Sequence, residues 1–140
     1  MKTEARIQQE CLIWLNNNHG LTKHNPRLIM FSVPNELGGE VGGLLKRLGC
    51  SSKIINEVVS YIIKKMTLIG LLKGACDTIV VLPNKTLYVE FKTNTGQQSD
   101  AQKDFQSRIV SLGHSYHLIR SLDQFQNVIQ LALANNDNNG

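Results

Sequence analysis

At 140 residues, with 41% hydrophobic and 19% charged residues, the chain has the size and composition of one globular domain. No apolar run approaches the ~18 residues that cross a bilayer, so neither secretion nor membrane spanning is indicated. Three widely spaced cysteines fit no disulfide framework or zinc site and indicate a reducing, cytoplasmic compartment. The formal net charge of +4 is a modest indication of a polyanionic partner.

The N-terminal half predicts helices around one short strand. Apolar residues at helical spacing predict a helix over 4–17, and the apolar run at 28–33 is typical of a short buried strand. Four glycines at 38–43 predict a flexible loop, followed by a short helix at 43–48. Over 52–66, pairs of apolar residues recur every four positions, which predicts an amphipathic helix with a wide apolar stripe.

A β-hairpin is predicted next, with strands over 77–82 and 87–92 and a loop at 83–86. Beyond a polar loop, Ser99 and Gln102 have the spacing of a capping box, in which two side chains satisfy backbone groups at the start of a helix. This pattern predicts a helix that begins after the hairpin.

The C-terminal part predicts one more strand and one more helix. The strand covers 115–120, and a second capping box, Ser121 with Gln124, opens the helix. The polar tail at 135–140 is expected to be disordered. The order of elements predicts a single α/β domain over 1–134, built on a mixed sheet with helices against it.

Three charged residues, Asp77, Glu90 and Lys92, interrupt the two best strands. Because side chains alternate along a strand, a hairpin loop with an even number of residues places all three on one face. A loop centred after Asn84 would put Asp77 opposite Lys92. The same register would put Ile79 opposite Glu90. A three-residue loop would separate the charges, so the prediction depends on the turn.

Two carboxylates that meet on one sheet face repel each other unless something neutralises them. A hard divalent cation does so, because Mg²⁺ prefers oxygen ligands and is often held by one or two carboxylates plus a substrate phosphate. A neighbouring lysine can position the attacking water or stabilise charge on the phosphorus. The pattern therefore indicates phosphodiester hydrolysis. The alternative is an exposed hairpin face with ordinary cross-strand ion pairs.

Basic residues are concentrated between Glu40 and Cys76. Only Glu40 and Glu57 oppose them, so the net charge of this segment equals the +4 of the whole chain. Either a phosphate-facing patch or an ordinary solvated helical surface explains the enrichment. The basic residues are Lys46, Arg47, Lys53, Lys64, Lys65 and Lys73.

Six short segments, taken in order, resemble the PD-(D/E)XK nuclease superfamily and, within it, the VRR-NUC (virus-type replication-repair nuclease) domain. Glu90–Thr93 resembles the Glu-x-Lys-Thr strand of that domain, and Lys73–Asp77 resembles its Gly-x-Pro-Asp entry, with Cys76 in place of the usual proline. The resemblance spans nearly the whole chain except 38–72 and the tail. The other matching segments are Glu4–Gln8, Val33–Asn35, Gly96–Gln102 and Gly113–Ser121.

The resemblance implies a restriction-endonuclease-like mixed sheet flanked by helices, with a helical insertion at 38–72 that is longer than expected for the family. It also implies that Asp77 and Glu90 are metal ligands, together with the backbone carbonyl of Phe91. Lys92 would orient or activate the attacking water.

Further site residues are implied on the two flanking helices. Glu4 would reach the metal directly or through water, with Gln8 in support, although an acid in the first turn of a helix is also favoured by the helix dipole. Glu10 is an alternative acid on a different helix face. Gln102 has two candidate roles, as capping-box partner and as hydrogen bonder in the active site. Asn35 is expected to contact nucleic acid along with the basic residues.

The activity that the resemblance implies is a Mg²⁺- or Mn²⁺-dependent DNA endonuclease, selective for branched or four-way (Holliday) junction DNA in replication, repair or recombination. Stand-alone members of this size resemble viral or bacterial proteins that act as homodimers inside a bacterium or an infected host cell. The apolar pairs from Ile54 to Ile63 are a candidate interface, although core packing explains at least half of them. Two alternatives stay open: a sequence-specific restriction-type endonuclease and a non-catalytic DNA-binding module.

Overall fold

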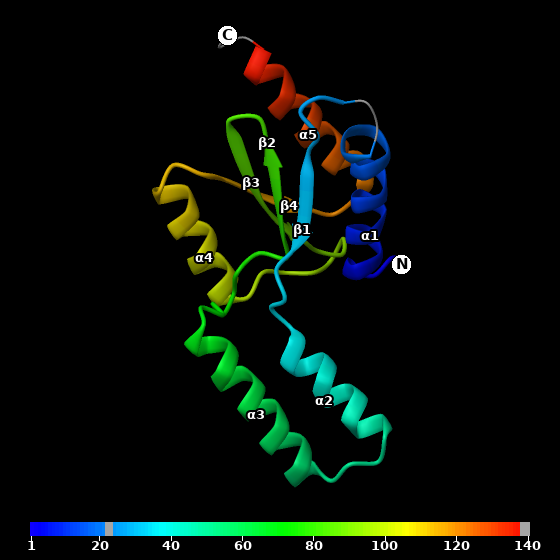
Figure 1. Ribbon diagram of the computed structural model, residues 1–140, viewed down its shortest axis with the longest axis vertical. Coiled ribbons are helices and arrows are strands. Elements are labelled where there is room, and N and C mark those ends of the chain that lie inside the picture. Colours follow the sequence, from blue (N-terminus) through cyan, green and yellow to red (C-terminus); the bar gives the residue numbers. More distant parts are fainter. Residues whose placement is uncertain (22–23, 138–140) are drawn as a thin grey trace.

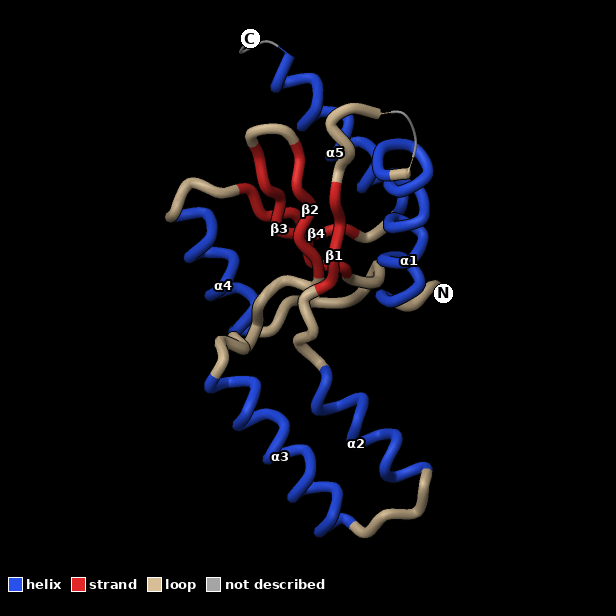
Figure 2. Tube along the Cα trace, in the orientation of Figure 1, coloured by secondary structure: helices blue, strands red, loops and turns tan. Residues whose placement is uncertain are grey.

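A four-stranded mixed sheet forms the centre of the fold, with helices against both faces, as the sequence predicts (Figure 2). The computed structural model describes residues 1–21 and 24–137. The first three strands are antiparallel, and the fourth lies parallel to the third because a helix makes the crossover between them. In spatial order the strands are β1 (Ile29–Ser32), β2 (Thr78–Leu82), β3 (Lys85–Phe91) and β4 (Ser115–Ile119).

Helices α1 (Glu4–Leu15) and α5 (Leu122–Asp137) cover one face of the sheet, and α4 (Asp100–Ser111) packs on the other (Figure 1). On the α4 side, the Phe105 ring meets Tyr88 and Tyr116 with centroids 6.3 and 6.2 Å apart. The apolar core lies on the α1/α5 side. Its members include Ile7, Cys11, Leu15, Val80, Leu87, Val89, Phe91, Phe125 and Ile129, all of which are buried.

The prediction of a flexible glycine loop at 38–43 is wrong, because this segment is helical. Helix α2 (Leu37–Arg47) and helix α3 (Ser52–Leu68) form an antiparallel pair, the α2–α3 hairpin, which projects from the sheet body (Figure 1). Gly38 and Gly42 face α3 so closely that a Cβ on them would lie 3.1 Å from Ile63 and 3.2 Å from Val59. The glycines therefore permit close helix packing, which outweighs their low helix propensity.

The loop of the β-hairpin has an even number of residues, as the prediction of one shared face requires, but the strands pair in a different register from the predicted one. Leu82 pairs with Lys85, so the loop is Pro83 and Asn84 alone, with Asn84 at φ 57°. Thr78 pairs with Val89, which places Asp77 next to Glu90 rather than opposite Lys92. Likewise Ile79 pairs with Tyr88, not with Glu90. The three charged residues still share one side of the hairpin.

The helix ends agree with the sequence only in part. Ser99 and Gln102 form the expected capping box. At Ser121, the hydroxyl accepts from the Gln124 N–H at 3.2 Å, but the Gln124 side chain accepts from the backbone of Arg120 instead of closing the box.

Helix α5 continues to Asp137, past the expected boundary at 134, and the remaining tail, 138–140, lies outside the described residues. Within the part of the chain that the structure describes, no helix is long and apolar enough to cross a membrane.

Candidate active site

Asp77 stands immediately before β2, at the end of a tight connection from the α2–α3 hairpin. Gly74, at φ 81°, makes the closest approach in this connection, because a Cβ there would lie 2.3 Å from the backbone of Ala101 in α4. The Phe91 N–H donates to Asp77 Oδ2 at 2.7 Å, and the Val33 N–H donates to the Asp77 carbonyl at 2.8 Å. Neighbouring backbone thus holds both the residue and its carboxylate in place.

Glu90 and Lys92 are buried, with 0% and 8% of their surface exposed. Lys92 Nζ lies 3.1 Å from Glu90 Oε1 and 3.8 Å from Glu4 Oε1. Such burial excludes the alternative of an exposed hairpin face. Because burying charges is costly even when they are paired, this ion pair is weak evidence for added stability, and its two residues are candidates for a functional site.

The electrostatics of the site follow from this crowding. Burial, reinforced by the charge of Asp77, raises the pKa of Glu90 to about 7. Burial also raises the pKa of Asp77, although the hydrogen bond from Phe91 opposes the shift. For Lys92, burial acts to lower the pKa, but the hydrogen bond to Glu90 and the nearby carboxylates outweigh it and raise the pKa. Lys92 therefore stays cationic.

The donor set fits a divalent, oxygen-preferring cation. Glu90 Oε2 is buried without a hydrogen-bond partner among the described residues, which leaves an uncompensated acceptor beside Asp77. Among these same residues, no group of three or more Asp, Glu, His or Cys side chains is placed so that it could hold a metal ion by itself. Two protein carboxylates completed by phosphate and water is a common arrangement for Mg²⁺.

The two predicted residues of α1 have different surroundings. Glu4 reaches Lys92, and the backbone at Gly96 lies so close that a Cβ there would be 3.3 Å from Glu4 Oε1. Gln8 donates to Thr78 Oγ1 at 3.0 Å, so it links α1 to β2. Glu10, the alternative acid, is bound by Lys2 and Arg6 in ion pairs at 2.7 and 3.2 Å, outside the cluster.

Gln102 has both of its candidate roles at once. Its Oε1 accepts from the Ser99 N–H at 2.8 Å, which completes the capping box. Its Nε2 donates to Glu90 Oε1, the oxygen that also faces Lys92. The amide has a separate acceptor and donor, so the alternatives that the sequence left open do not compete.

Two polar side chains hold the backbone around the site. The Asn35 amide donates to the carbonyls of Ala75 and Cys76, immediately before Asp77. This group, predicted to contact nucleic acid, is therefore engaged with backbone. The Arg120 guanidinium donates to the Thr93 and Gly96 carbonyls and closes the loop beside Glu4. The resemblance included both residues, but nothing in the sequence indicated these carbonyl partners.

The predicted basic patch is divided between the two ends of the α2–α3 hairpin. Helix α3 separates these ends by about 25 Å, at ~1.5 Å per residue. Lys46, Arg47 and Lys53 lie at the tip, whereas Lys64, Lys65 and Lys73 lie toward the base, and all six are exposed.

A cleft of about 320 Å³, the Asp77 cleft, lies where the base of this hairpin meets Asp77. Its walls come from α1, the segment after β1 and the start of α2, and Asp77 lies in it. The lining residues include Glu4, Gln8, Val33, Glu36, Glu40 and Asp77. Asp77, at the carboxylate end of the β-hairpin, is thus accessible to a ligand from solvent.

The sheet order, the flanking helices and the charged end of the β-hairpin define a restriction-endonuclease-like domain. A solved structure described as a "VRR_NUC domain protein" is similar to this chain, with a TM-score of 0.64 and 16% identity, covering 94% of this chain and 88% of the other. The chain has this VRR-NUC type of fold, as the sequence resemblance predicted. The predicted helical insertion at 38–72 corresponds to the α2–α3 hairpin of this chain. No family model and no curated protein matches the sequence.

Proposed function

We propose that the protein is a metal-dependent nuclease that hydrolyses DNA phosphodiesters. The observation that carries this proposal is the cluster of half-buried Asp77 with buried Glu90 and Lys92, in which Glu90 Oε2 has no partner among the described residues. A purely DNA-binding module would have no use for carboxylates that face phosphate, because like charges repel.

Asp77 and Glu90, with the Phe91 carbonyl, would hold Mg²⁺ or Mn²⁺. The bound metal would supply Lewis-acid chemistry and a more acidic water. Lys92, cationic and 3.1 Å from Glu90, orients the attacking water and stabilises charge on the phosphorus. Gln102 keeps Glu90 in position through its amide donor. Glu4, partly exposed at the mouth of the cleft, accepts a proton or a water hydrogen bond there.

We further propose that the enzyme acts as a homodimer on branched or four-way junction DNA, since two sites related by a two-fold axis suit such a substrate. The exposed apolar residues of the α2–α3 hairpin support a self-association surface. Ile55 is removed from the candidate interface because it faces α2, where a Cβ at Gly42 would lie 3.6 Å from it. Ile54, Tyr61 and Leu68 are exposed and form the candidate interface.

The activity is tested by comparing wild type with Asp77→Asn and Glu90→Gln on linear, flapped, looped and four-way DNA, with Mg²⁺, Mn²⁺ or EDTA. The matched control is Asp104→Asn, an exposed acid on α4. We expect metal-dependent cutting by wild type and the control only, fastest on branched DNA. Equal cutting by all variants would overturn the site. Dependence on base sequence would favour a restriction-type enzyme, and tight binding without cutting would favour a binding module.

Self-association is tested by sedimentation of Ile54→Glu/Leu68→Glu. The matched control is Val110→Glu/Leu112→Glu, at exposed apolar positions in and just after α4. We expect the first variant alone to be monomeric. A dimer that survives both changes would exclude the α2–α3 hairpin as the interface.

A further inference from the structure

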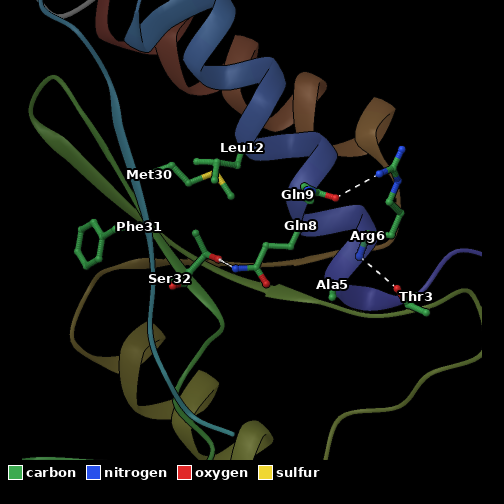
Figure 3. Close-up of a pocket in the computed structure, with 10 residues that line it drawn as sticks. Thr3, Ala5, Arg6, Gln8, Gln9, Leu12, Met30, Phe31 and Ser32 are labelled. Carbon is green, nitrogen blue, oxygen red and sulfur yellow. Dashed lines mark hydrogen bonds between the residues drawn. The ribbon is translucent and has the colours of Figure 1, made fainter. Parts of the chain in front are cut away.

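A groove of about 590 Å³ runs between α1 and the edge strand β1. Figure 3 shows Leu12 and Gln8 on the helix pointing toward Met30 and Ser32 on the strand. In the same view the Arg6 guanidinium donates to Gln9 Oε1 at 3.2 Å, and both side chains point away from the strand. In this view the Phe31 side chain points away from the helix. The volume is within the ~300–1,000 Å³ typical of small-molecule sites. It is therefore large enough for one nucleotide but not for duplex DNA.

The groove adjoins the Asp77 cleft. Ala5, Gln8 and Ser32 line both cavities, and the hydrogen bond from Gln8 to Thr78 lies where they join. Gln9 in the groove lies five positions along α1 from Glu4 at the cleft, a rise of about 7.5 Å. This rise is comparable to one nucleotide of an extended strand. A strand whose phosphate lies beside Lys92 could thus place its next nucleotide in the groove.

The lining of the groove suits a nucleobase better than a second phosphate. Leu12, Met30 and Ala5 offer apolar surface to the flat faces of a ring. Amide and hydroxyl groups around this surface can hydrogen-bond the edges of a base, as in other ligand sites where a few polar groups set orientation. The one cation in the lining, Arg6, is already paired with Glu10 at 3.2 Å.

We propose that the α1–β1 groove binds one unpaired nucleotide adjacent to the phosphodiester that is cut. The proposal rests on the proposed nuclease function and deepens it, because it gives a physical basis for choosing branched DNA. A nucleotide at a flap, gap or junction is already unpaired, whereas one inside a duplex must first be unstacked, at a free-energy cost. Paired DNA therefore binds more weakly at this position.

Gln9→Phe tests the proposal by placing an aromatic ring at the edge of the groove, at an exposed helix position that does not line the Asp77 cleft. Gln130→Phe makes the same change at an exposed position on α5, away from both cavities, and serves as the matched control. The probe is flapped DNA with a single 2-aminopurine at successive positions beside the branch, bound in EDTA. The melting temperature of each variant is measured to verify folding.

With wild type and Gln130→Phe, we expect fluorescence to rise about twofold at one position, because that base leaves the stack. Gln9→Phe should lose this rise, and its Kd for the DNA should increase about tenfold, equivalent to about 1.4 kcal/mol. No rise at any position with wild type, or the same rise with Gln9→Phe, would overturn the groove proposal even if Mg²⁺-dependent cutting is intact. A Gln9-dependent rise without cutting would instead overturn the nuclease proposal and support the groove.

Discussion

In the sheet body two charged side chains are almost fully buried, whereas in the α2–α3 hairpin large apolar side chains are exposed. Glu90 and Lys92 are 0% and 8% accessible, but Leu48 is 70% and Leu68 is 79% accessible. No side chain of helix α3 is fully buried among the described residues, although Val59 and Ile63 pack against the glycines of α2. Both arrangements oppose the usual partition, in which apolar side chains are buried and charged ones are exposed. Exposed apolar patches are typical of interaction surfaces, and buried charges are typical of functional sites.

The two regions meet at Asp77. Val33, on the way into the α2–α3 hairpin, donates to the Asp77 carbonyl, and Asn35 donates to the two carbonyls that precede Asp77 on the way out. Both connections of the hairpin are therefore tied to the backbone at and just before Asp77. We therefore expect substitutions in the sheet body to have the largest effects and those in the α2–α3 hairpin the smallest. Substitutions at this junction should have intermediate effects.

The largest difference is expected for removal of a lysine. Lys92→Ala leaves the Glu90 carboxylate buried without its cation, which should cost about 3–5 kcal/mol of unfolding free energy at pH 8. Lys64→Ala, at an exposed position on α3, should cost less than about 0.5 kcal/mol. Urea unfolding followed by circular dichroism measures both. Equal losses would mean that the Glu90–Lys92 pair is no more important to stability than a surface charge.

The next effect is a pH dependence confined to the body. Because the pKa of Glu90 is raised from 4.5 to about 7 in the folded state, the unfolded state releases this proton first as pH rises. Folded stability should therefore fall between about pH 4.5 and 7, by about 3 kcal/mol from this group. Glu90→Gln removes the titration, so its stability in EDTA should decline less with pH. Parallel stability profiles for the two proteins would contradict the raised pKa.

The sequence predicts the site in the sheet body better than it predicts the α2–α3 hairpin. Alternation along β3 and the even-numbered turn are local features, and they placed Asp77, Glu90 and Lys92 together. The register was missed because Pro83 and Asn84 alone make the turn, with Asn84 in the left-handed conformation.

Tertiary contacts account for the other differences. Glycines normally weaken a helix, so the pattern at 38–43 predicts a loop unless α3 supplies side chains against Gly38 and Gly42. The partners of Asn35 lie 40 and 41 residues away in the chain, beyond any local pattern. Gln102 was recognisable because its capping role is local, whereas its bond to Glu90 needs the α4 crossover.

A smaller effect is expected at the junction. Asn35→Ala removes both bonds to the connection before Asp77, so the carboxylate should lose orientation. Outer hydrogen bonds of this kind change metal affinity by about 10–100-fold. We expect the Mn²⁺ concentration for half-maximal cutting to rise by that factor, with DNA binding in EDTA unchanged. A matched loss of DNA binding would instead support the predicted contact between Asn35 and nucleic acid.

The smallest effect separates the two faces of α2. A Cβ added at Gly39 or Gly43 would meet no atom of the described residues within 4 Å, so alanine adds helix propensity there without a clash. Each change should stabilise the helix by about 0.5–1 kcal/mol. At Gly38 and Gly42 the added methyl meets Ile63 and Val59, so Gly38→Ala/Gly42→Ala should yield no gain or a loss.

Hydrogen exchange of the α2 amides measures this difference directly, because it reports the opening of the hairpin separately from global unfolding. We expect Gly39→Ala/Gly43→Ala to slow exchange in α2 and to leave the amides of β3 unchanged. Gly38→Ala/Gly42→Ala should exchange as fast as wild type or faster. If both double variants slowed exchange equally, close packing of α2 on α3 would not be the reason for its glycines. If exchange in β3 changed with that in α2, the hairpin and the sheet body would unfold as one unit, and the contrast between the two regions would not extend to their stability.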